Sequence, residues 1–149
     1  MDNFKFKIAQ SAIIRNADDN ILILRHKEGR WLLPGGRLKA TEPWHVGLRR
    51  EVAEETGIVE FAIQEICDID TWVDVDGWPT YGVTFLCQVR STPRVVLSDE
   101  HRSYVWIQTD DVDRFDFWNS AVKDRIVRAA SDEGHWRAQE SYRDRPSIH

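Results

Sequence analysis

The chain has 149 residues, of which 42% are hydrophobic and 30% are charged, and its net charge at pH 7 is −5. These values suit one soluble globular domain and exclude a mainly disordered chain. Because the charge is negative and no basic stripe is present, polymeric nucleic acid is a poor candidate partner. A small phosphorylated ligand stays open, since a metal ion can supply the positive charge that such a ligand needs.

The predicted elements are mostly extended segments, with two helices. In chain order they are strands over residues 5–15, 21–26 and 31–33, a helix over 43–56, extended segments over 58–75 and 81–90, a short strand over 104–107 and a helix over 119–130. The first helix carries Trp44, Leu48 and Val52 at four-residue spacing, which predicts one buried stripe. Gly57 follows as a suitable residue to end it.

The two ends of the chain carry less structural signal. Apolar residues are sparse after residue 131, so we predict one domain over residues 1–132 and a loosely packed tail over 133–149. The N-terminus lacks the apolar segment of a signal peptide, and no apolar run is long enough to span a membrane. We therefore expect a cytoplasmic protein without a membrane partner.

Three carboxylates of the first predicted helix are spaced to share one face. Glu51, Glu54 and Glu55 fall at i, i+3 and i+4, in the last two turns of the helix. Like charges at this spacing, and acids at a helix C-terminus, both destabilise a helix, and such conflicts tend to mark functional sites. Oxygen ligands without His or Cys favour Mg²⁺, or Mn²⁺, over Zn²⁺. The backbone of Gly36 can approach the same ion, and Arg50 can reach Glu54. A solvated acidic face is the structural alternative.

The three acids belong to a longer pattern of fixed positions that covers 23 residues. Gly36 is followed by five residues and Glu42, then by seven residues and the run Arg50-Glu51-Val52-Ala53-Glu54-Glu55-Thr56-Gly57-Ile58. This string resembles the Nudix box, G-x5-E-x7-R-E-U-x-E-E-x-G-U, in which U is a bulky aliphatic residue, and it matches every fixed position. The strand pattern on either side is similar to the rest of that domain over about residues 5–130.

The resemblance implies a fold, a reaction and roles for residues. The fold is an α/β/α sandwich with a mixed β-sheet between helices. The reaction is metal-dependent hydrolysis of the diphosphate linkage in a nucleoside triphosphate, nucleotide sugar or dinucleotide, by attack of water at phosphorus. The resemblance implies a metal ligand at the Gly36 carbonyl oxygen and at each of the three carboxylates, Glu51, Glu54 and Glu55. It also implies that Arg50 orients the carboxylates and that Glu42 supports the loop before the helix.

The general base and the substrate contacts are less constrained. Glu51 and Glu100 are both candidates for the base, and Glu100 lies in a predicted loop before the strand over 104–107. Arg25 is a candidate for a phosphate contact, with an exposed strand-end charge as the alternative. The candidates for stacking on a base, each with packing as the alternative, are Trp31, Trp72 and Trp78.

Two other functions compete with a nucleotide hydrolase. A catalytically silent Nudix-like module that senses a nucleotide would not need a costly acid cluster, which argues against this alternative. An RNA 5′-end hydrolase is a weaker alternative, because the basic surface expected for RNA is missing. The expected partner is a small nucleotide substrate. A homodimer is left open.

Overall fold

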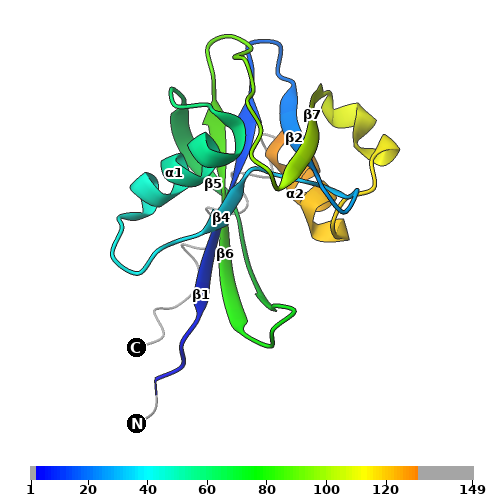
Figure 1. Cartoon of the computed structure of the whole chain (residues 1–149). Coiled ribbons are helices and arrows are strands. Elements are labelled where there is room, and N and C mark those ends of the chain that lie inside the picture. The colour runs from blue at the N-terminus through cyan, green and yellow to red at the C-terminus, as the bar shows by residue number, and fades with distance from the viewer. Residues whose placement is uncertain (1–2, 131–149) are drawn as a thin grey trace, which may run out of the picture.

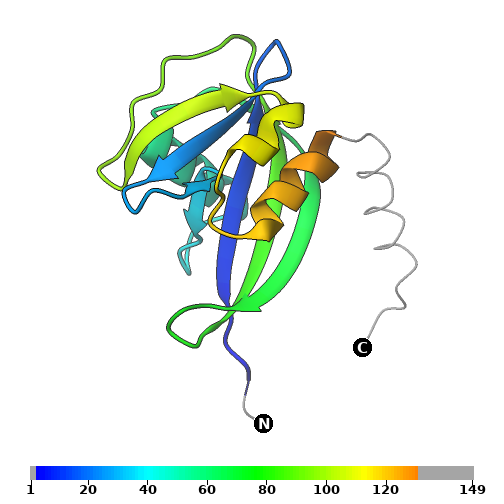
Figure 2. The same cartoon turned by 90° about the vertical axis from the view of Figure 1, so that its right-hand side faces the viewer.

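One sheet lies between helix α1 on one face and helix α2 on the other (Figure 1 and Figure 2). The computed structural model describes residues 3–130. Its strands are β1 (Lys7–Arg15), β2 (Ile21–His26), β3 (Trp31–Leu32), β4 (Gly35–Arg37), β5 (Ala62–Val73), β6 (Pro79–Gln88) and β7 (His101–Ile107). Its helices are α1 (Trp44–Thr56), the 3₁₀-helix η1 (Thr109–Arg114) and α2 (Ser120–Ala130). The predicted α/β fold with a mixed sheet between helices is confirmed.

Strand β1 lies at the centre of the sheet. The order is β3-β2-β1-β6-β5, with β4 also paired to β1 and β7 to β2. β1 and β6 are parallel, and they align Ala9 with Gly82 and Ser11 with Thr84. The other pairs are antiparallel. Because successive side chains of a strand point to opposite faces of the sheet, the side chains of β1 and β6 alternately face α1 and α2.

Strand β4 lies between the predicted strand over 31–33 and the predicted helix over 43–56, where no element was expected. Gly35 pairs with Ser11, and a Cβ atom at Gly35 would overlap the backbone carbonyl oxygen of Gln10. The φ of Gly35 is 155°, a backbone conformation that residues with a side chain rarely adopt. Gly35 thus allows a close backbone approach, which joins β4 to the central strand.

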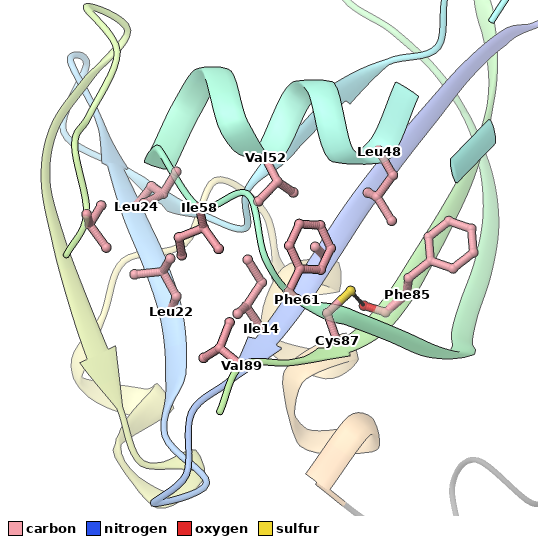
Figure 3. Close-up of a cluster of buried hydrophobic side chains, with 12 residues drawn as sticks. Ile14, Leu22, Leu24, Leu48, Val52, Ile58, Phe61, Phe85, Cys87 and Val89 are labelled. Carbon is pink, nitrogen blue, oxygen red and sulfur yellow. Dashed lines mark hydrogen bonds between the residues drawn. The ribbon is translucent and has the colours of Figure 1, made fainter. Parts of the chain in front are cut away.

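Helix α1 covers one hydrophobic cluster with Leu48 and Val52, two of the three residues of the predicted buried stripe (Figure 3). Leu48 and Val52 are fully buried, whereas Trp44 at the helix start is 47% exposed and stacks on Phe85. Gly57 ends the helix with a φ of 73° and donates its backbone N–H to the carbonyl of Ala53 at 2.9 Å. This packing fixes the acidic face of α1 relative to the sheet.

Helix α2 covers a second cluster on the opposite face of the sheet. Val122 and Ile126 are buried there with Ile13 of β1 and Leu86 of β6. Within residues 3–130, no helix is long and apolar enough to cross a membrane. The predicted tail over 133–149 lies outside the described residues.

Candidate active site

Arg50 links the loop before α1 to the acids of the helix. Its Nε and Nη2 atoms donate to the two carboxylate oxygens of Glu42, at 3.0 and 2.7 Å. Its Nη1 atom donates to Glu51 at 2.8 Å and more weakly to Glu54 at 3.4 Å. The hydrogen bonds from Arg50, and then the one from the backbone N–H of Lys39, lower the pKa of Glu42 to about 2. Glu42 is thus ionised and holds the arginine in position.

Gly36 lies directly against the carboxylate of Glu51. A Cβ atom at this position would overlap the carboxyl carbon and both carboxylate oxygens of Glu51. Glycine at this position therefore lets the backbone of β4 lie against the carboxylate in its observed place, and a larger residue would displace the carboxylate. The arrangement places a backbone strand beside an acid of the helix, at the two positions the sequence predicted as metal ligands.

Glu55 is the most buried of the three acids on α1. Its side chain is 7% exposed, compared with 18% for Glu51 and 58% for Glu54. The backbone N–H of Gly35 donates to Oε1 at 3.2 Å, while Oε2 is buried without a hydrogen-bond partner among the described residues. Burial, with smaller contributions from neighbouring carboxylates, raises the pKa of Glu55 to about 8.

His101 lies beside this unpartnered oxygen. Its Nε2 atom is 3.4 Å from Oε2 of Glu55, and only 7% of the residue is exposed. Burial lowers the pKa of His101. A neutral imidazole therefore faces a carboxyl group that also favours its neutral form. No local pattern pairs two residues that lie 46 positions apart in the chain, so this contact could not be predicted from the sequence.

The residues present suit a divalent cation in their chemistry. Glu51, Glu54, Glu55 and the Gly36 carbonyl offer only oxygen atoms, and the buried oxygen of Glu55 lacks a partner. Among residues 3–130, no three His, Cys, Asp or Glu side chains are gathered into a complete cation site. The carboxylates are instead directed toward Arg50 and Gly35.

Beside these acids, a cavity of about 380 Å³ lies on the α2 side of the sheet. We call it the α2-side cavity; its lining includes Ala9, Ser11, Gly35, Gly36, Glu55, Trp72, Gly82, Thr84, Glu100, His101, Trp118, Val122 and Arg125. Glu100 is exposed and lies in the turn just before β7. The cavity thus brings Glu100 and Glu55 to one space, where a phosphorylated group and its attacking water could be held.

Three residues predicted to contact substrate, Arg25, Trp31 and Trp78, lie outside the lining of this cavity, whereas Trp72 lines it. Arg25 is exposed, and its Nε donates to the carbonyl of Gly29 in the β2–β3 turn at 3.1 Å. Trp31 packs edge-on against Phe115, with ring centroids 5.2 Å apart. Their contact with substrate stays a prediction. Trp118 lines the cavity but was not a candidate, because nothing in the sequence marks which side of the sheet it faces.

Comparisons with known proteins agree with the fold and the motif. A family model described as NUDIX domain matches residues 5–129. The RNA pyrophosphohydrolase of Zymomonas mobilis is 32% identical over 79 residues, which make up 51% of this chain and 51% of that protein. Putative nudix hydrolase 1 of Caenorhabditis elegans is 31% identical over 94 residues, or 59% of this chain and 24% of that protein.

A solved structure extends the likeness over most of the chain. The MutT protein from Methanosarcina mazei Go1 superposes with a TM-score of 0.74 at 27% identity, over 87% of this chain and 96% of that one. By contrast, the chain spans about half or less of the length of the curated relatives it matches. The likeness to those relatives is therefore one of a shared domain.

Proposed function

Because the chain belongs to the Nudix family, we propose that it hydrolyses the diphosphate linkage of a nucleoside diphosphate joined to another moiety. The observation that carries this proposal is that Gly36 and Glu55, two fixed positions of the box, line a cavity of about 380 Å³. The cavity is large enough for a small ligand, and Glu100 reaches it from another element. The substrate classes we propose are nucleoside triphosphates, nucleotide sugars and dinucleotides.

Nudix hydrolases generally use divalent metal ions, and we propose Mg²⁺, with Mn²⁺ as the alternative, at the box acids. Such an ion would neutralise phosphate charge and lower the pKa of a bound water. Glu51, Glu54, Glu55 and the Gly36 carbonyl would hold it. Arg50 keeps Glu51 oriented through its 2.8 Å hydrogen bond, and its own position is set by Glu42.

For the general base we favour Glu100 over Glu51. Glu51 is held by Arg50 and is also proposed as a metal ligand, and both interactions weaken a carboxylate as a base. Glu100 is exposed at the cavity, and its backbone carbonyl accepts a hydrogen bond from Lys27 at 3.0 Å, which fixes the turn that carries it. Glu100 would therefore accept the proton of the attacking water.

One relative favours a second substrate class. The RNA pyrophosphohydrolase of Zymomonas mobilis acts, by its name, on RNA, so a 5′-phosphorylated RNA end is a second candidate substrate. The net charge of −5 opposes tight binding to an RNA chain. We therefore propose a small nucleotide as the main partner. The predicted cytoplasmic location is retained as a proposal, and the homodimer is left open as in the sequence analysis.

A substrate panel tests the proposed function. The full chain is incubated with Mg²⁺ and nucleoside triphosphates, nucleotide sugars, dinucleotides or a 5′-triphosphorylated RNA oligonucleotide, and the products are identified. We expect cleavage within a diphosphate linkage that stops in chelator and returns with Mg²⁺ or Mn²⁺. Glu54→Gln serves as the matched inactive control. Nucleotide binding without turnover of any compound would instead favour the sensor module.

A further inference from the structure

His101 lies where three elements meet beside the acids of α1. It is the first residue of β7 and aligns with His26, the last residue of β2, next to a register shift between these two strands. Its ring packs edge-on against the ring of His26, with centroids 6.0 Å apart. Only 2% of the His101 side chain is exposed, so its position is set by these neighbours and by Glu55 of α1.

A closed turn joins His101 to the residue proposed as general base. The backbone N–H of His101 donates to the carbonyl of Ser98 at 3.2 Å, which closes the turn over residues 98–101. Glu100 lies inside this turn, and its own carbonyl accepts the N–H of Lys27 at 3.0 Å. Glu100 is exposed at the cavity, whereas His101, the next residue, is buried. One short turn therefore carries both the acid at the cavity and the imidazole that faces Glu55.

The imidazole of His101 meets a polar group at each of its two nitrogen atoms. Nδ1 lies 3.4 Å from the hydroxyl oxygen of Ser98, and Nε2 lies 3.4 Å from Oε2 of Glu55. A neutral imidazole has one N–H donor and one acceptor nitrogen, and a hydroxyl can donate to the acceptor. When the Ser98 hydroxyl donates to Nδ1, the ring proton is on Nε2 and faces Glu55. The opposite tautomer would set Nε2 and a carboxylate oxygen, two acceptors, against each other.

Oε2 of Glu55 is the atom that this N–H can satisfy. Oε1 already accepts the backbone N–H of Gly35 at 3.2 Å, whereas Oε2 is buried without a hydrogen bond among residues 3–130. A buried polar atom without a partner is destabilising. At 3.4 Å the contact with His101 is only slightly too long, and a shift of about 0.4 Å would bring it to a normal hydrogen-bond distance. An ionised carboxylate would also be the stronger acceptor.

We propose that His101 is a positioning residue for Glu55, whose carboxylate it holds through Nε2–H while Glu55 acts as a cation ligand. Each carboxylate oxygen has two lone pairs, so an oxygen that accepts a hydrogen bond can still bind a cation. Gly35 would hold Oε1 from β4, and His101 would hold Oε2 from β7. Loss of such a supporting hydrogen bond typically weakens metal binding by about 10- to 100-fold. The inference rests on the proposed function for the role of Glu55 as a metal ligand.

Two substitutions of His101 separate the N–H donor from the ring. His101→Gln places an amide near the position of Nε2, from which it can donate to Glu55. His101→Asn places its amide near the position of Nδ1, within reach of Ser98 but not of Glu55. Both variants lose the ring and its packing against His26, so they share the damage that this loss causes. The difference between the two variants therefore reports the hydrogen bond to Glu55.

The measurement is the affinity of the full chain for Mn²⁺, followed without substrate by electron paramagnetic resonance of the free ion. We expect His101→Asn to bind Mn²⁺ about tenfold or more weakly than wild type, and His101→Gln to bind it almost as tightly as wild type. In a Glu55→Gln background the difference between the two variants should disappear, because His101 acts through the Glu55 carboxylate. A merely structural role of His101 would leave the difference unchanged there.

His26→Gln is the matched control. His26 packs against the same imidazole, but its own Nδ1 lies 3.9 Å from Glu28 and not at Glu55. We expect its Mn²⁺ affinity to equal that of wild type. Cooperative thermal unfolding in chelator identifies the variants that are folded.

The outcomes of this inference and of the proposed function are distinct. The inference is overturned if the glutamine and asparagine variants of His101 bind Mn²⁺ equally, or if their difference persists in the Glu55→Gln background. Either result leaves the hydrolysis of a diphosphate linkage by wild type intact. Conversely, failure of wild type to hydrolyse any compound of the panel, with the difference in Mn²⁺ affinity present, would overturn the proposed function alone.

Discussion

Replacing Glu55 with glutamine should stabilise the protein in chelator at neutral and alkaline pH. Gln keeps the volume of the side chain and can still accept the hydrogen bond from Gly35 through Oε1. It removes a carboxyl group whose pKa burial raises to about 8, against 4.5 for an ordinary glutamate. The buried acid therefore costs free energy of folding whenever the unfolded chain is ionised.

The size of this effect follows from the two pKa values. Below pH 4.5 Glu55 is protonated in both states, so its ionisation costs nothing. Between pH 4.5 and 8 the unfolded chain releases the proton and the folded protein keeps it, so the free energy of unfolding falls by about 1.4 kcal/mol per pH unit. At pH 7 the difference reaches about 3 kcal/mol, a large part of the stability of a typical domain. Above pH 8 it levels off.

Urea unfolding of wild type and Glu55→Gln at pH 4.5, 6, 7 and 8.5, all in chelator, measures this difference directly. The stability gap between the two proteins should be small at pH 4.5 and grow in favour of the variant up to about pH 8. Subtracting the free energy of unfolding of wild type from that of the variant at each pH cancels the contributions of the other titrating groups. A gap that is constant with pH would refute the argument that Glu55 is held protonated by burial.

Three further predictions concern other residues of the candidate active site. Glu54→Gln should leave the fold intact and abolish most turnover in the presence of Mg²⁺, and wild-type turnover would remove Glu54 from the metal ligands. Glu100→Gln should lower kcat by roughly 10² to 10⁴ with little change in KM; an unchanged kcat across pH would return the role of base to Glu51. Gly36→Ala should displace the Glu51 carboxylate and weaken Mn²⁺ binding measured by calorimetry. In a double-mutant cycle with Glu51→Gln the two losses should not add, and additive losses would show that Gly36 acts independently.

The acidic helix could be predicted because it depends on local spacing. The helix predicted over 43–56 is observed as Trp44–Thr56, and the buried stripe of Leu48 and Val52 follows from the same period. The difference in burial among the three acids could not be predicted. Glu55 is covered by Gly35 and His101, which belong to other elements, so its environment depends on how distant segments meet.

The cavity could not be predicted for a similar reason. Ala9 and Gly82 are unremarkable in the sequence, and they create a hollow only because parallel pairing of β1 with β6 places them side by side. The same holds for the aromatic residues. Trp31 packs edge-on against Phe115, and its contact with substrate stays a prediction, while Trp118 lines the cavity. Register and strand face decide which surface each ring covers.

The position of β1 has a consequence for how the chain folds during synthesis. Ser11 and Thr84 lie side by side in the finished sheet, yet they are 73 residues apart in the chain. At ribosomal rates of about 5–20 residues per second, β1 waits roughly 4–15 s for its parallel partner to be made. Such non-local pairing also slows folding. During this interval the apolar run Ala12-Ile13-Ile14 has one edge without a strand to bind, which makes the nascent N-terminal half a natural client for chaperones.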